Sequence, residues 1–223
     1  MLAERAMEEV TREQIDLSIN AKDFSVAQVS LGKFWRHSPT AAAAGFVVSR
    51  FETLRPHITL TRCKVAILRS FTVEPAVPLL RALAFVGGID LDARLGDFDS
   101  YVQEVLNTSG WVYEFSPDVA ILAVQTRDIV PALWDGFADL DSAAVRSAIE
   151  DALSRYRLII KSFRAKSSAH LIIHSLQIPT PPALGLLDNR NDFGQAASIA
   201  QSIRDFANSP ALKRMSTSSI TMP

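Results

Sequence analysis

The sequence predicts an α/β protein, a three-layer αβα sandwich built on a mostly parallel sheet. Segments with strand character alternate with segments of helical spacing, in the order βαβαβαβα after a helical lead. The first strand segment, 65–68, is a continuous apolar run between Lys64 and Arg69, which is typical of a strand buried on both faces. Right-handed crossovers and the chain length favour the strand order 2-1-3-4.

The other strand segments differ in pattern, and each pattern indicates a place in the sheet. Residues 89–95 alternate apolar and polar side chains, as a half-exposed edge strand does. Residues 119–124 are continuously apolar, as strands at a sheet centre are. A fourth strand is expected over 170–176.

The connecting helices follow from helical spacing and from capping signals. Pro75 fits the first position of the helix after the first strand, with Thr72 or Glu74 as its cap. Further helices are expected over about 100–106, over 141–166 with Asp141 as the cap, and over 195–207.

The chain is expected to divide into three parts. Residues 1–58 form a helical N-terminal extension, with helices over about 3–13, 24–35 and 41–54. Residues 59–207 form the α/β domain, and the Ser- and Thr-rich residues 208–223 form a flexible tail. One expected role for the extension is a homodimer or domain contact.

Composition narrows the classes of function. The 223 residues include 23 Lys and Arg against 24 Asp and Glu, so no basic surface for nucleic acid or an anionic membrane is expected. No apolar run approaches the roughly 18 residues of a membrane span. The lone Cys63 excludes an internal disulfide, and the start of the chain does not resemble a secretory signal. We expect a soluble, cytoplasmic protein without a metal site or cofactor loop.

The candidate site lies where two expected strands end. Ser70 follows the first strand, and Arg127 with Asp128 follows the third. In the order 2-1-3-4 these positions meet in one crevice at the carboxyl ends of the strands. Arg69 and Arg127 are candidates to bind an anionic small molecule there, and structural ion pairs with Asp97 and Asp128 are an equally open interpretation.

Short motifs at these positions resemble those of SGNH (GDSL-type) hydrolases. The run 68–72, Leu-Arg-Ser-Phe-Thr, sits where that superfamily carries Gly-Asp-Ser-x-Thr. The run 125–128, Gln-Thr-Arg-Asp, sits where it carries Gly-x-Asn-Asp, and Gly96 sits where it carries a second glycine block. The resemblance implies a flavodoxin-like parallel sheet and Ser70 as the nucleophile.

Residues 65–128 more closely resemble the N-terminal domain of FkbH-like proteins. The shared marks are Ser-Phe-Thr after the first strand, Tyr-Val-Gln-Glu at 101–104, Trp-Val-Tyr-Glu-Phe-Ser-Pro-Asp at 111–118, and the later Arg-Asp. In that family an SGNH-like domain precedes a HAD-type phosphatase domain. The resemblance implies a role in loading a glyceryl unit, from a phosphorylated glycerate, onto an acyl carrier protein in polyketide-type biosynthesis.

The chain departs from both families at the groups that carry chemistry. No Asp-x-x-His follows the fourth strand, and His170 and His174 belong to that strand itself. No HAD-type Asp-x-Asp-x-Thr motif is present. The chain adds one helix after the fourth strand, where an SGNH-like domain adds a fifth strand. We therefore expect that strand to be missing and the open edge to be covered by the N-terminal helices or another chain.

Three functions stay open. The favoured one is an accessory domain of an FkbH-like protein that binds rather than reacts, with a carrier protein, a phosphatase domain and an anionic small molecule as partners. The second is a serine esterase or acyltransferase that uses Ser70 with His170, His174 or a histidine beyond this chain as base. The third is a structural scaffold. The expected ligand-binding residues are Arg69, Thr72, Gly96, Asp97, Gln125, Arg127 and Asp128.

Overall fold

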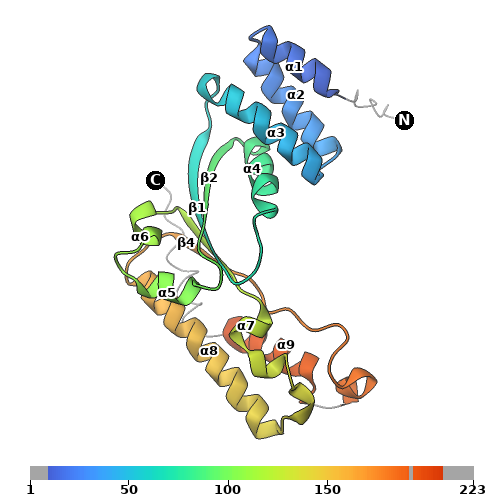
Figure 1. Ribbon diagram of the computed structural model, residues 1–223, viewed down its shortest axis with the longest axis vertical. Helices are drawn as coiled ribbons and strands as arrows, with labels where there is room; N and C mark the ends of the chain where they lie inside the picture. Colours follow the sequence, from blue (N-terminus) through green and yellow to red (C-terminus); the bar gives the residue numbers. More distant parts are fainter. Residues whose placement is uncertain (1–9, 191–192, 208–223) are drawn as a thin grey trace, which may run out of the picture. The chain divides into compact units, whose positions relative to one another are not determined.

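The computed structural model describes residues 10–190 and 193–207, and it has the expected α/β class. Four strands form one parallel sheet in the order β2-β1-β3-β4, with helices flanking the sheet (Figure 1). The strands are β1 (Thr61–Arg69), β2 (Ile89–Leu95), β3 (Val119–Ala123) and β4 (His170–Ile173). The predicted strand order is confirmed, and β2 lies at an edge as expected.

Contacts along the chain divide it into two compact units. The first contains Met1–Val65 and Thr72–Arg94, and the second contains Ala66–Phe71 and Leu95–Pro223. These limits differ from the boundaries expected at residues 58 and 207, and the division into domains stays a prediction. The expected tail, 208–223, lies outside the described residues.

The first unit contains helices, the amino-terminal part of β1 and most of β2. Its helices are α1 (Arg12–Asn20), α2 (Phe24–His37), α3 (Ala41–Leu54), the short η1 (Arg55–His57) and α4 (Ala76–Val86). A continuous apolar core fills the space between them, with Leu31, Val47, Phe51 and Phe85 among its buried side chains. Burial of this apolar surface stabilises the unit.

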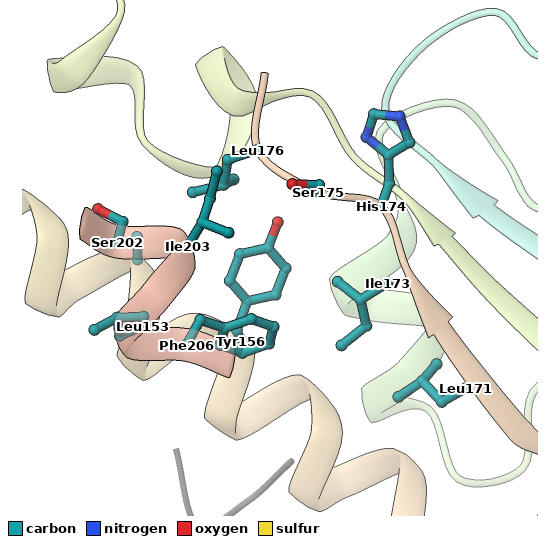
Figure 2. Close-up of a pocket in the computed structure, with 11 residues that line it drawn as sticks. Leu153, Tyr156, Leu171, Ile173, His174, Ser175, Leu176, Ser202, Ile203 and Phe206 are labelled. Carbon is teal, nitrogen blue, oxygen red and sulfur yellow. The ribbon is translucent and has the colours of Figure 1, made fainter. Parts of the chain in front are cut away.

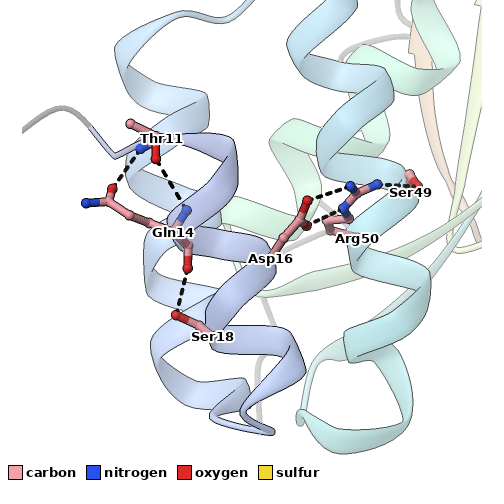
Figure 3. Close-up of polar contacts among 6 residues, drawn as sticks. All are labelled: Thr11, Gln14, Asp16, Ser18, Ser49 and Arg50. Carbon is pink, nitrogen blue, oxygen red and sulfur yellow. Dashed lines mark hydrogen bonds and ion pairs between the residues drawn. The ribbon is translucent and has the colours of Figure 1, made fainter.

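Two helix starts in this unit differ from the expectation. The first described helix begins at Arg12 rather than near residue 3, because Thr11 and Gln14 form a reciprocal capping box there (Figure 3). The expected residues before position 10 lie outside the described range. The sequence predicted Thr72 or Glu74 as the cap of α4 and Pro75 as its first residue. In the structure Pro75 itself is the N-cap, and the helix begins at Ala76.

A bidentate ion pair joins α1 to α3 (Figure 3). Arg50 donates from Nε and Nη2 to the two carboxylate oxygens of Asp16, at 2.7 and 2.8 Å. The hydrogen bonds from Arg50 lower the pKa of Asp16, and the same bonds raise the pKa of Arg50.

Replacing Asp16 with asparagine is expected to lower the free energy of unfolding at pH 7 by about 0.5–1 kcal/mol, since water screens a pair of partly exposed side chains. The pKa of Asp16 is lowered in the folded state, so its contribution is present at neutral pH and is lost as the pH falls below about 4. Urea denaturation of both proteins between pH 7 and pH 3 measures this. A difference between them that persists unchanged at pH 3 contradicts the assignment.

The second unit holds the carboxyl ends of the strands and the remaining helices. These are α5 (Tyr101–Leu106), α6 (Trp111–Phe115), α7 (Thr126–Ile129), α8 (Ser142–Arg164) and α9 (Gln195–Ala207), with the short η2 (Pro131–Leu133), η3 (Phe137–Asp139) and η4 (Gly185–Arg190). The side chain of Asp141 accepts from the Ala144 amide and caps α8 as predicted. The apolar core of the second unit includes Leu122, Ile129 and Phe163.

No helix in the described part of the chain is both long enough and apolar enough to cross a membrane.

Candidate functional site

Ser70 lies at the carboxyl end of β1 and ties that strand to the segment after β3. Its amide donates to the carbonyl of Ala123 at 3.0 Å, and its Oγ accepts from the amide of Gln125 at 2.9 Å. The Ser70 side chain is buried, with 4% of the residue exposed. The hydroxyl that the sequence places first among the catalytic candidates therefore already holds two strand ends together.

The residues after β3 form the short helix α7, in which neighbouring side chains have different environments. Arg127 has a 59% exposed side chain, and its Nε lies 3.9 Å from Oδ1 of Asp128. Asp128 Oδ2 is buried and has no hydrogen-bond partner among the described residues. Thr126 is buried instead, and its Oγ1 donates to the carbonyl of Gln177.

Arg69 is directed to the backbone that follows β2. Its Nε donates to the carbonyl of Gly96 at 3.0 Å, and its guanidinium lies 5.9 Å from the ring centroid of Phe98. The amide of Gly96 donates to the carbonyl of Ile67 at 2.9 Å. Arg69 and Gly96 thus fix the turn after β2 against β1.

Glu104 in α5 holds the same turn from the other side. Its Oε1 accepts from the amide of Asp97 at 2.9 Å and from the indole Nε1 of Trp111 at 3.0 Å. A Cβ at Gly96 would meet Glu104 Oε2 at 2.2 Å, so the carboxylate approaches closely only because the residue is glycine. Sequence reasoning assigned no role to Glu104, although the residue stands in the quoted segment 101–104.

Three amides near Ser70 that could stabilise an oxyanion already have acceptors. Those of Gly96, Asp97 and Gln125 donate to Ile67, Glu104 and Ser70 respectively. An acyl-transfer site needs donors aimed at the place where negative charge develops. In this conformation the three amides instead stabilise the ends of the strands.

The two candidate bases lie at opposite ends of β4. His170 is paired with Val119, the first residue of β3, so it lies at the amino end of β4, away from Ser70. His174 follows the carboxyl end of β4, and its ring centroid lies 6.1 Å from that of Phe71. Within the described parts of the chain no hydrogen bond joins His174 to Ser70. Of the two histidines, only His174 lies at the same end of the strands as Ser70, where a base would be needed.

Two buried tyrosines, Tyr101 in α5 and Tyr156 in α8, were missed as functional candidates. Burial raises the pKa of Tyr101, the carboxylates of Asp99 and Asp128 raise it further, and Arg155 opposes them. Tyr156 is also buried, and its hydroxyl has no hydrogen-bond partner in the described structure. Tyr156 lies on the buried face of α8, where helical spacing of apolar residues contains no signal for an unpartnered hydroxyl.

Thr72 is exposed and belongs to the first unit.

Over residues 10–190 and 193–207, no group of three or more His, Cys, Asp or Glu side chains is arranged to hold a metal ion.

Comparisons with known proteins place the fold but not the chemistry. No protein-family model matches the chain, and no curated protein matches it. One solved structure is similar, the N-terminal part of the protein BF1531 from Bacteroides fragilis, described as containing a phosphatase domain complexed with Mg. The identity is 13% and the TM-score is 0.54, over 67% of this chain and 38% of that chain. This chain is thus an α/β protein similar in fold to part of a longer, phosphatase-containing protein.

Proposed function

We propose that this chain is an accessory, SGNH-hydrolase-like domain of an FkbH-like protein. In this proposal the domain binds an anionic small molecule, a phosphorylated glycerate, and assists the loading of a glyceryl unit onto an acyl carrier protein. The resemblance of residues 65–128 to that family motivates the assignment. The similarity in fold to a protein with a phosphatase domain supports a HAD-type partner domain. The carrier protein and the polyketide-type pathway rest on the resemblance alone.

The hydrogen bond from the Gln125 amide to Ser70 Oγ is the observation that carries the accessory role. A serine nucleophile needs a nearby base to take its proton and free donors to stabilise the oxyanion. Here the Ser70 oxygen is an acceptor for the backbone, and the amides of Gly96, Asp97 and Gln125 already donate to acceptors within the protein. The arrangement supports a domain that positions a ligand without attacking it.

The residues after β3 supply the chemistry for an anionic, hydroxylated ligand. The exposed guanidinium of Arg127 suits a phosphate or carboxylate group. The Oδ2 atom of Asp128 is a hydrogen-bond acceptor without a donor among the described residues, and a hydroxyl group of the ligand could donate to it. A phosphorylated glycerate carries both kinds of group. The proposed set within the second unit is Arg69, Gly96, Asp97, Gln125, Arg127 and Asp128, and Thr72, which belongs to the first unit, stays a prediction from the sequence.

Thermal unfolding in increasing concentrations of 3-phosphoglycerate tests this proposal. A ligand that binds the folded state raises the melting temperature as its concentration increases. Arg127→Gln is expected to weaken binding about tenfold, the loss expected for a hydrogen bond to a charged group. Arg62→Gln removes the same charge from the exposed amino end of β1 and should leave binding unchanged. No stabilisation of the wild type, or equal losses in both variants, contradicts the proposal.

The second candidate is a serine esterase or acyltransferase. The observation that favours it is the position of His174, which follows the carboxyl end of its strand as Ser70 does and has its ring against Phe71. A shift of this loop that brought the imidazole to Ser70 Oγ would supply the missing base. Ester turnover that requires both Ser70 and His174 is the result that this candidate predicts.

A further inference from the structure

A pocket of about 240 Å³ lies in the second unit between β4, α8 and α9 (Figure 2). Most of its lining is apolar, with side chains from all three elements and from the segment after β4. The apolar lining residues include Leu153, Leu171, Ile173, Leu176, Ile203 and Phe206. A pocket of this composition favours an apolar ligand, since polar groups of a ligand would lose their contacts with water there.

The hydroxyl of Tyr156 is the exception to the apolar lining. Figure 2 shows it pointing into the space between the segment after β4 and α9. The residue is 98% buried, and its hydroxyl has no hydrogen-bond partner in the described part of the chain. Buried polar groups in proteins are nearly always paired, so an orphaned hydroxyl that faces a cavity indicates an absent partner.

Tyr156 can act in this pocket as a donor with a fixed direction. Burial raises the pKa of its phenol well above the usual range, so the hydroxyl keeps its proton at every physiological pH. Its ring packs against that of Phe206, with 4.8 Å between the centroids. The group that it lacks is therefore a hydrogen-bond acceptor carried by the ligand.

The remaining polar groups of the lining favour a neutral ligand. Ser202 Oγ already donates to the carbonyl of Ser198 at 2.9 Å. His174 and Ser175 are exposed residues at the end of β4. Among the described residues that line the pocket there is no Lys, Arg, Asp or Glu, and the one histidine, His174, is an exposed residue, so the lining favours a neutral ligand.

We propose that this pocket binds a neutral acyl compound, with its aliphatic chain among the apolar side chains and its carbonyl oxygen accepting from Tyr156. At about 30 Å³ for each non-hydrogen atom, as for water in the liquid, the volume holds about eight such atoms. That size corresponds to an acyl chain of about six or seven carbons. The proposal does not depend on the function proposed for the strand ends, which concerns an anionic ligand and other residues.

Heptan-2-one is a suitable probe, because it combines a short alkyl chain with one carbonyl oxygen. Titration into the full chain, followed by amide chemical shifts, is expected to show saturable changes confined to β4, α8 and α9. Tyr156→Phe keeps the ring and removes the hydroxyl, so affinity should fall about fivefold, as expected for one neutral hydrogen bond. Ile203→Trp fills the pocket and should weaken binding by at least tenfold.

Tyr113→Phe is the matched control. The Tyr113 hydroxyl donates to the carbonyl of Val105 at 2.6 Å, outside the pocket, so its removal should leave affinity for heptan-2-one unchanged. In the free proteins, Tyr156→Phe should melt no lower than the wild type, since its hydroxyl makes no hydrogen bond, whereas Tyr113→Phe should melt lower.

Two results overturn the proposal. One is the absence of saturable binding to the wild type, which is also the outcome if another part of the chain fills the pocket. The other is equal affinity of the wild type and Tyr156→Phe, which would show that no carbonyl meets this hydroxyl. Neither result bears on binding of 3-phosphoglycerate, so failure of this proposal is distinguishable from failure of the proposed function.

Discussion

Replacing Asp188 with alanine is expected to lower the free energy of unfolding by about 3 kcal/mol, because one buried and one partly buried amide lose a charged acceptor. The carboxylate accepts from the amide of Gln195 at 2.7 Å and from that of Ala196 at 3.1 Å, and Asp188 is 1% exposed. These amides begin α9 and have no partners within the helix. The negative charge also lies at the positive end of the helix dipole. Urea denaturation at pH 7 measures the loss.

Two further variants make this prediction specific. Asp188→Asn keeps one acceptor oxygen and removes the charge, so about half of the loss is expected. Asp205→Asn changes an exposed carboxylate on the same helix, which accepts only a surface hydrogen bond from Gln201, and should be nearly neutral. Because α9 carries Ile203 and Phe206, Asp188→Ala should also weaken binding of heptan-2-one. A loss in Asp188→Ala no larger than that in Asp205→Asn refutes the capping role.

The second large effect is expected at Ser70. Ser70→Ala removes the acceptor of the Gln125 amide, and a buried amide without a partner costs about 1–3 kcal/mol. We therefore expect a loss of about 2 kcal/mol, with little change in the slope of the urea transition. Hydrogen exchange of the Gln125 amide should also become faster, since that amide loses its bond between the ends of β1 and β3.

Ser100→Ala is the control for this variant. Its Oγ donates to the carbonyl of Phe98 at 3.3 Å in a partly exposed turn, where water replaces the lost bond. A change below about 0.5 kcal/mol is expected, as for most surface substitutions. If Ser70→Ala were as stable as Ser100→Ala, the hydroxyl of Ser70 would not be structural.

The sequence predicted much of the architecture because several signals are local. The Asp141 cap and the apolar stripe of α8 depend on neighbours three or four residues apart, and the predicted bounds of α9 agree with those observed. β1 is longer than its apolar run, since it begins at Thr61, whose amide donates to the carbonyl of Gly88. Backbone pairing of this kind leaves no trace in the apolar pattern.

For the site, the sequence predicts which strand ends are neighbours, because this follows from the strand order, but it does not predict the contacts between their side chains. Parallel strands in the order 2-1-3-4 bring the end of β1 beside the segment after β3, where the Gln125 amide donates to Ser70, and the crevice expected to hold Ser70 with Arg127 and Asp128 stays a prediction. The use of that hydroxyl as an acceptor depends on the exact separation of two strand ends. The contact of Glu104 with Gly96 and the direction of the Tyr156 hydroxyl depend on how helices pack, and spacing along the chain does not determine either.

Hydrolysis of a p-nitrophenyl ester by the wild type and by Ser70→Ala tests the central claim most directly. The measurement is made at a temperature where circular dichroism shows both proteins folded. The account predicts that Ser70 only joins the strand ends and that the site there binds a ligand without reacting with it. Both proteins should then release p-nitrophenol no faster than buffer without protein. Turnover by the wild type that disappears in Ser70→Ala would contradict the account and establish Ser70 as a nucleophile.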